Sequence, residues 1–124
     1  MIKMYSKKAL QHFKKPKNFG IIKNADGIGR AGNPVCGDVM EVYIKVNKGK
    51  IKDCKFKTFG CVAAIAASDV LCELCKGKTI KQAKKITAKQ ISDYLGKLPT
   101  IKLHCSVLGR ETLKKAIEDY EKRN

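Results

Sequence analysis

The sequence contains no tryptophan, and aromatic residues make up 6% of its 124 residues, leaving few aromatic side chains for a core. No apolar run approaches the length of a membrane-spanning helix, so we expect no membrane association. The first fifteen residues carry lysines but no apolar segment with a small-residue cleavage site, which argues against a secretory signal and favours a cytoplasmic location. With 44% hydrophobic and 31% charged residues, the chain is not a disordered polar sequence. Its length suits one small domain spanning residues 1–124.

Arginine is also scarce, although the chain is strongly basic. The 27 basic and 11 acidic residues give a net charge of +16, yet only Arg30, Arg110 and Arg123 are arginines. Proteins that recognise specific nucleic-acid sites rely on arginine for bidentate contacts to bases and phosphates. The lysines are instead spread along the whole chain. We therefore expect no specific nucleic-acid binding, while attraction to an acidic protein partner stays open.

A helix followed by a long loop is expected in the first third of the chain. Tyr5, Ala9 and Phe13 recur at helical spacing, and Pro16 ends that helix. The segment from Asn18 to Asp38 is rich in glycine and asparagine and lacks periodicity, so we predict a loop there. A loop of this length is uncommon in a small domain and is often functional.

A β-hairpin is expected next. Residues 40–46 alternate apolar and polar side chains, as a half-buried strand does. Residues 47–50 have turn chemistry, and residues 51–59 are predicted to form the return strand. Cys54 and Phe56 then share one face of that strand.

Helices are expected over the second half of the chain. The Ala-rich, almost wholly apolar run from Val62 to Cys75 predicts a buried helix, and Gly77 ends it. Two short helices are each predicted to begin with a Thr-x-x-Gln capping box, at residues 79–82 and 87–90. A last, amphipathic helix follows Pro99 and runs to the C-terminus. The order of helix, hairpin and helices predicts an α+β fold.

Six cysteines occur in a chain for which we expect a reducing compartment, and this favours thiolate ligands or reactive thiols over disulfides. Three of them are predicted to lie in turns. Cys36 lies between glycines in the segment 32–38, Cys61 stands between a strand and a helix, and Cys105 follows His104 at the start of the last helix. A thiol at a helix N-terminus feels the positive end of the helix dipole, which favours the thiolate form.

Together with Asp38 and His104, these three cysteines form a candidate metal-ligand set. Soft thiolates select zinc and iron–sulfur clusters, whereas a carboxylate or imidazole makes the fourth bond weaker or exchangeable. The cysteines are 25 and then 44 residues apart, unlike the close pairs of structural zinc sites. Considered alone, the pattern predicts a metal or cluster site, with a structural or storage zinc protein as the alternative to a cluster carrier.

The remaining cysteines are expected to pack in the core. Cys54 shares a strand face with Phe56, which predicts a buried and inert thiol. Cys72 and Cys75 form a C-x-x-C pair inside a predicted helix, without the strand–helix context of a redox motif. Packing is the favoured interpretation of this pair, and a secondary metal or redox pair is the alternative.

Three ordered motifs resemble the ligand motifs of the IscU/NifU-type iron–sulfur cluster assembly scaffolds. These motifs are Gly32-Asn33-Pro34-Val35-Cys36-Gly37-Asp38, Phe56-Lys57-Thr58-Phe59-Gly60-Cys61 and Leu103-His104-Cys105-Ser106. The similarity covers essentially the whole chain, and His104 with the short Cys61–Cys105 interval resembles the IscU/NifU group and not the related SufU group. The resemblance implies an IscU-like α+β fold, in which a hairpin and a short third strand form a small antiparallel sheet packed against several helices.

The same resemblance implies a scaffold and not an enzyme. Such proteins receive sulfur from a cysteine desulfurase, combine it with iron, hold a transient [2Fe–2S] cluster and pass it to apo iron–sulfur proteins. It implies that Cys36, Cys61 and Cys105 are cluster ligands, that Asp38 and His104 share their pocket, and that zinc can occupy the empty site. We expect Cys105 to accept the persulfide and Asp38 to promote cluster release. The segment Leu98-Pro99-Thr100-Ile101-Lys102 stands at the position of the family's Hsp70-type chaperone motif, with a threonine in place of its second proline.

Overall fold

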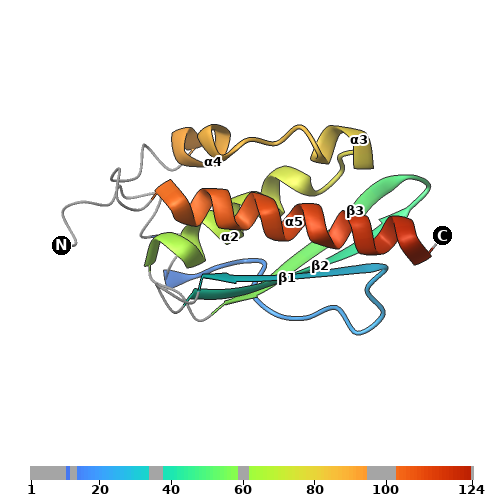
Figure 1. Cartoon of the computed structure of the whole chain (residues 1–124), viewed down its shortest axis with the longest axis horizontal. Coiled ribbons are helices and arrows are strands. Elements are labelled where there is room, and N and C mark those ends of the chain that lie inside the picture. The colour runs from blue at the N-terminus through green and yellow to red at the C-terminus, as the bar shows by residue number, and fades with distance from the viewer. Residues whose placement is uncertain (1–10, 12–13, 34–37, 59–61, 95–102, 124) are drawn as a thin grey trace.

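A three-stranded antiparallel sheet with the strand order β1-β2-β3 forms one layer of the molecule (Figure 1). The computed structural model describes residues 11, 14–33, 38–58, 62–94 and 103–123. The predicted hairpin is confirmed, and Lys48 (φ 53°) and Gly49 (φ 77°) have the positive φ angles of a two-residue turn whose twist matches the flanking strands. The strands are β1 (Gly27–Asn33), β2 (Asp38–Asn47) and β3 (Lys50–Thr58).

Strand β1 corrects the prediction of a loop from Asn18 to Asp38. The expected third strand of the sheet is present, and it lies inside that segment. Gly27 and Gly29 face the last helix, α5 (Leu103–Arg123), and a methyl group added at either would lie 2.2 Å from a backbone carbonyl oxygen of α5. Glycine is therefore required here by the close approach of a strand to a helix. The loop prediction was wrong for residues 27–33, because it treated each glycine as a turn signal.

The predicted helices of the second half are confirmed where the structure describes them. Gly77 takes a left-handed conformation (φ 80°) just after α2 and ends it. Both capping boxes are present: Thr79 Oγ1 accepts from the Gln82 amide at 3.1 Å, and Thr87 Oγ1 accepts from the Gln90 amide at 3.1 Å. The helices before α5 are α2 (Val62–Cys75), α3 (Ile80–Ala83) and α4 (Ala88–Tyr94).

Two helices cover one face of the sheet. Helix α5 packs across β1 and β2, α2 packs against β3, and α4 lies against α5 on the side away from the sheet (Figure 1). The core forms between the sheet and these two helices, as the alternation of β2 predicted. Its fully buried apolar members include Met40, Val42, Ile44, Cys54, Phe56, Val70, Leu71, Cys72, Leu113, Ala116 and Ile117.

The chain before β1 runs along the free edge of β3. The Phe56 amide donates to the Asn18 carbonyl at 2.9 Å, and the Gly20 amide donates to the Phe56 carbonyl at 2.8 Å. Most of the predicted first helix lies outside the described residues, although Gln11 and Lys14 are helical; Pro99 also lies outside. In the described part of the chain, no helix has the length and apolar character needed to cross a membrane.

Candidate functional site

Three of the five predicted ligand residues have a described backbone. Cys36 and Cys61 lie outside the described residues, and of Asp38, His104 and Cys105 only the backbone is described. Asp38 is the first residue of β2, and His104 and Cys105 are the second and third residues of α5. Within the described part of the chain, no group of three or more His, Cys, Asp or Glu side chains could hold a metal ion.

The start of β2 and the end of β3 lie side by side. Met40 pairs with Thr58 in the antiparallel register, and Thr58 Oγ1 donates a hydrogen bond to the Val39 carbonyl at 2.7 Å. In the sequence, Cys36 stands two residues before the first residue of β2, and Cys61 stands three residues after the last residue of β3. The described strand ends that stand nearest to these two cysteines in the sequence, the start of β2 and the end of β3, therefore lie at the same end of the sheet.

The N-terminal part of α5 reaches the same end of the sheet. A methyl group added at Gly109 would lie 3.4 Å from Leu71 Cδ2 and 3.9 Å from Met40 Sδ. Cys105 precedes Gly109 by one helical turn, a rise of about 6 Å, and Asp38 precedes Met40 by two strand residues, a rise of about 7 Å. Figure 1 shows the starts of α2 and α5 above this end of the sheet. The structure thus brings the described backbones of Asp38, His104 and Cys105 to one region.

Two features of this region bear on its chemistry. Cys105 lies in the first turn of α5, as predicted, where the unpaired amides and the helix dipole favour an anionic group. In the core between β2 and α2, Ser68 Oγ donates a hydrogen bond to Met40 Sδ at 3.3 Å, and both residues are fully buried. This buried contact joins β2 to α2.

A buried polar network that the sequence analysis missed holds the N-terminal segment against α2. The Asn18 amide donates to Asp69 Oδ1 at 2.9 Å, and Asn18 Nδ2 donates to Asp69 Oδ1 at 3.0 Å and to Glu73 Oε1 at 3.0 Å. Lys76 Nζ donates to Asn18 Oδ1. The Asn18 hydrogen bond holds the pKa of Glu73 below its ordinary value. No sequence signal pairs Asn18 with Asp69, because the two residues are 51 positions apart.

On the outer face of the sheet, Glu41 of β2 pairs with Arg30 of β1. Arg30 Nε donates to Glu41 Oε2 at 2.7 Å, and this hydrogen bond lowers the pKa of Glu41. Burial, together with the neighbouring Glu41, raises the pKa of Tyr43. The Glu41 carboxylate is therefore held by an arginine, three residues along β2 from Asp38.

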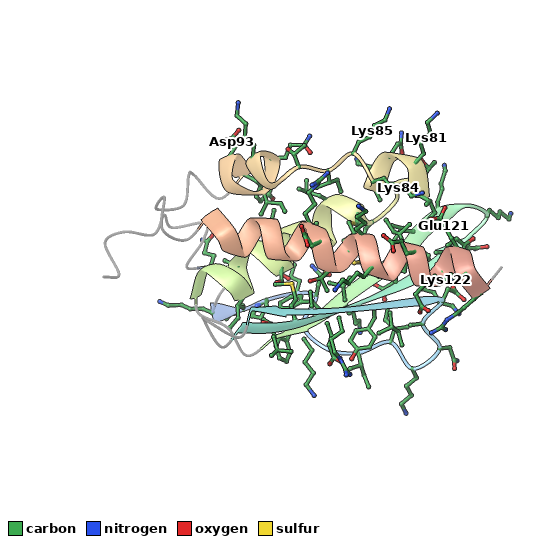
Figure 2. All side chains as sticks on the ribbon, in the orientation of Figure 1. Lys81, Lys84, Lys85, Asp93, Glu121 and Lys122 are labelled. Carbon is green, nitrogen blue, oxygen red and sulfur yellow. The ribbon has the colours of Figure 1, made fainter. Side chains whose placement is uncertain are left out.

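A groove of about 430 Å³ lies between the end of α3 and the part of α5 from Arg110 to Glu121. Both basic and acidic side chains line the groove. Lys84 forms an ion pair with Glu121 at 3.0 Å, and Glu118 also lies along the wall. Figure 2 shows Lys81 and Lys85 pointing into solvent on the side away from the sheet. The mixed charges of this groove give it no clear preference for an anionic or a cationic ligand.

The expected packing of the other cysteines is confirmed. Cys54, Cys72 and Cys75 are all free thiols and fully buried. Cys54 Sγ of β3 and Cys72 Sγ of α2 lie 3.4 Å apart and are hydrogen-bonded. The sequence placed each thiol in the core but could not indicate that the strand and the helix bring them into contact.

The family model and several similar proteins all indicate the same protein family. The model of the NifU-like N terminal domain matches residues 4–124. The "Iron-sulfur cluster assembly scaffold protein IscU 1" of Archaeoglobus fulgidus is 53% identical over 121 residues, covering 98% of this chain and 79% of that protein. The IscU scaffold protein of Aquifex aeolicus is 51% identical over 118 residues, covering 94% and 75%.

Solved structures agree on the fold. A candidate SUF-system iron–sulfur cluster assembly scaffold protein from Fervidobacterium islandicum superposes with a TM-score of 0.77 at 27% identity, covering 93% of this chain and 97% of that one. The N-terminal part of a NifU-like protein from Brucella abortus has a TM-score of 0.75 at 17% identity, covering 98% and 96%, and supports the fold alone. The α+β fold expected from the resemblance is confirmed, and the chain belongs to the NifU-like N-terminal domain family.

Proposed function

We propose that this chain is a scaffold on which a transient [2Fe–2S] cluster is assembled from iron and desulfurase-derived sulfur and then passed to apo-proteins. The observation that carries the proposal is the 53% identity to the Archaeoglobus scaffold protein over 98% of this chain. The arrangement of the fold supports it, because the described starts of β2, α2 and α5 lie at one end of the sheet. The cluster is cargo, so the protein acts as a carrier and not as an enzyme.

Cys36, Cys61 and Cys105 are proposed as the thiolate ligands of the cluster, with Asp38 and His104 in the same pocket. Thiolates are the usual ligands of iron–sulfur clusters, and a carboxylate or an imidazole offers a weaker fourth bond. The same donors suit zinc, which can occupy the site when no cluster is bound. Residues 1–124 act as a single scaffold domain in this proposal.

Cys105 is the proposed persulfide acceptor. Its backbone lies in the first turn of α5, where the helix dipole favours a thiolate, and a thiolate is the form that attacks sulfur. His104 stands next to it in the chain. The sulfur donor in this proposal is a cysteine desulfurase, and the acceptors are apo iron–sulfur proteins in the cytoplasm.

An Hsp70-type chaperone is a further proposed partner, through residues 98–102. That segment lies outside the described residues, so the proposal rests on its sequence. It predicts that a peptide of residues 98–102 with short flanks competes with the chain for the chaperone. A scrambled peptide of the same composition is the control.

Anaerobic reconstitution with a desulfurase, cysteine and ferrous iron tests the proposal. We expect a brown chromophore with visible absorption bands and two irons per cluster. Serine at Cys36, Cys61 or Cys105 is expected to abolish it, whereas alanine at Cys72 or Cys75 leaves it, because these two thiols are buried in the core. Uptake of zinc without any chromophore in the unaltered chain would contradict the proposal and assign a zinc protein instead.

A further inference from the structure

Three thiols that the proposed function does not use lie together between β3 and α2. Cys54 points inward from β3, and Cys72 and Cys75 are one helical turn apart on α2. Cys54 Sγ lies 3.4 Å from Cys72 Sγ, and Cys75 also hydrogen-bonds Cys54. All three side chains are buried. The cluster therefore joins two elements that are separated in the chain by the segment containing Cys61.

The arrangement favours a bond between two sulfurs over a shared metal ion. No group of three or more ligating side chains in the described part of the chain could hold a metal. The Cys54 and Cys72 sulfurs are already at van der Waals contact and come from facing elements. A disulfide of about 2.05 Å requires the two sulfurs to approach by about 1.4 Å more.

The three thiols differ in acidity. Hydrogen bonds from Cys72 and Cys75 lower the pKa of Cys54. Burial raises the pKa of Cys72, and the hydrogen bond to Cys54 raises the pKa of Cys75. Among the charged groups nearby, Lys76 favours a thiolate at Cys54 and Asp53 opposes it. Of the three thiols, Cys54 is therefore the one at which the thiolate form is most favoured.

We propose that Cys54 and Cys72 form a reversible disulfide that crosslinks β3 to α2 when the protein meets hydrogen peroxide. The Cys54 thiolate attacks one peroxide oxygen, giving a sulfenic acid and hydroxide, which takes up the proton that Cys54 released. Cys72 sulfur then attacks the Cys54 sulfur, and the sulfenic oxygen leaves as water with the Cys72 proton. Two thiols lose two electrons and one peroxide becomes two waters. A small dithiol reverses the reaction by exchange.

The crosslink closes a loop across 18 sequence positions and fixes β3 against α2. A closed loop stabilises the folded protein chiefly by restricting the unfolded chain. Because Cys61 lies within this loop, the crosslink also restrains both elements that flank a proposed cluster ligand, a consequence that rests on the proposed function. The crosslink itself is tested below without iron or sulfide.

Peptide mapping provides the test. The 124-residue chain with serine at Cys36, Cys61 and Cys105 is incubated with hydrogen peroxide, alkylated under denaturing conditions and cut with trypsin and a protease that cleaves after glutamate. Cleavage after Glu73 separates Cys72 from Cys75, and Cys54 falls on Asp53-Cys54-Lys55. We expect Asp53-Cys54-Lys55 linked to the peptide ending at Glu73, a melting temperature raised by about 10 °C, and loss of both after dithiothreitol.

Two variants sharpen the test. Cys75→Ala is expected to keep the crosslink, whereas Cys72→Ala is expected to lose it and the melting-temperature shift. Amides of α2 before Cys72 should exchange hydrogen more slowly in the oxidised chain. A Cys72–Cys75 or Cys54–Cys75 linkage as the main product, or unmodified Cys54 after peroxide has oxidised an exposed reference thiol, would overturn the proposal. The same mapping on the unaltered apo chain guards against a folding defect in the serine variant.

Discussion

Gly29 of β1 lies directly against the backbone of Thr112 in α5. A methyl group added at Gly29 would come within 2.2 Å of the Thr112 carbonyl oxygen and 2.5 Å of the Ala116 amide nitrogen. Neither contact can be relieved by rotating a side chain, because both partners are backbone atoms. The absence of a side chain at Gly29 therefore sets how closely the last helix approaches the sheet.

This contact predicts a large effect for Gly29→Ala. The added methyl group must push α5 away from β1, and we expect the free energy of unfolding to fall by about 3 kcal/mol, at the upper end of overpacking effects. Urea unfolding followed by circular dichroism measures the loss as a shift of the midpoint at constant slope.

Gly109→Ala is the matched control, since it adds the same methyl group to a glycine of α5. There the nearest atom is the flexible end of Leu71, at 3.4 Å. Alanine is the better helix former by about 1 kcal/mol, so this variant is expected to be neutral or more stable. Equal destabilisation by both substitutions would show that the backbone contact at Gly29 does not cause the loss of stability.

A second prediction concerns the network around Asn18. Asn18→Ala removes the hydrogen bonds that its side chain donates to Asp69 and Glu73, and we expect a loss of about 2–3 kcal/mol at pH 7. Chemical unfolding at several pH values measures it. Gln11→Ala, an exposed substitution earlier in the same segment, is expected to change stability by less than about 0.5 kcal/mol.

The pH dependence of that loss has a defined sign. Because Asn18 lowers the pKa of Glu73 in the folded protein, this part of the stability is present above the ordinary glutamate pKa of 4.5 and disappears as pH falls through the lowered value. The difference between wild type and Asn18→Ala should therefore shrink below about pH 4. A difference that grows on acidification would contradict the assignment.

Local patterns in the sequence predicted most of the fold. The alternation of residues 40–46, the Ala-rich run of α2 and the two capping boxes each depend on residues close in sequence, and all are confirmed. Strand β1 was missed because its glycines are required by close contact with α5, which lies about 80 residues later in the chain. That constraint is tertiary, and no local pattern of glycines contains it.

The candidate site was likewise predicted from the sequence only where its features depend on neighbouring residues. The placement of Cys105 in the first turn of α5 followed from local signals and the motifs, whereas Asp38 was predicted to end a loop and is the first residue of β2. The contact of Cys54 with Cys72 and the pairing of Asn18 with Asp69 join residues 18 and 51 positions apart. Both depend on how α2 packs on β3 and on the chain beside it. The ligand roles of Cys36 and Cys61 stay predictions, since both lie outside the described residues.

A third prediction follows the proposed sulfur transfer. After brief incubation with a desulfurase and cysteine, without iron, persulfide should appear first on Cys105, because its place in the first turn of α5 favours the thiolate. Trypsin separates the candidates: Cys105 falls on residues 103–110, Cys36 on residues 31–45 and Cys61 on residues 58–76. Mass spectrometry of these peptides gives the order of labelling. In Cys105→Ser, persulfide labelling of the other two peptides should also fall. Dominant early labelling on residues 31–45 or 58–76 of the wild type would rule out Cys105 as the acceptor.

The last prediction is that Asp38→Ala lengthens the life of the bound cluster. A carboxylate is a harder ligand than a thiolate and binds cluster iron less firmly, so Asp38 offers a route by which iron can exchange ligands and leave. Asp38 begins β2, two residues after Cys36 and its flanking glycine, within reach of the same iron in our proposal. Removing the carboxylate leaves the three thiolates in place. We expect the decay of visible absorbance and the transfer to an apo-ferredoxin to slow by about tenfold, or ~1.4 kcal/mol in the barrier.

Glu41→Ala is the control for that experiment, because it removes another carboxylate from β2 whose side chain is already held by Arg30 on the outer face of the sheet. Its cluster should decay at the wild-type rate. Asp38→Asn adds a second comparison, since it keeps the size of the side chain but removes the charge, and it should resemble Asp38→Ala if the charge carries the effect. A faster decay in Asp38→Ala than in wild type would mean that Asp38 stabilises the cluster as a ligand, and the release role would then be wrong.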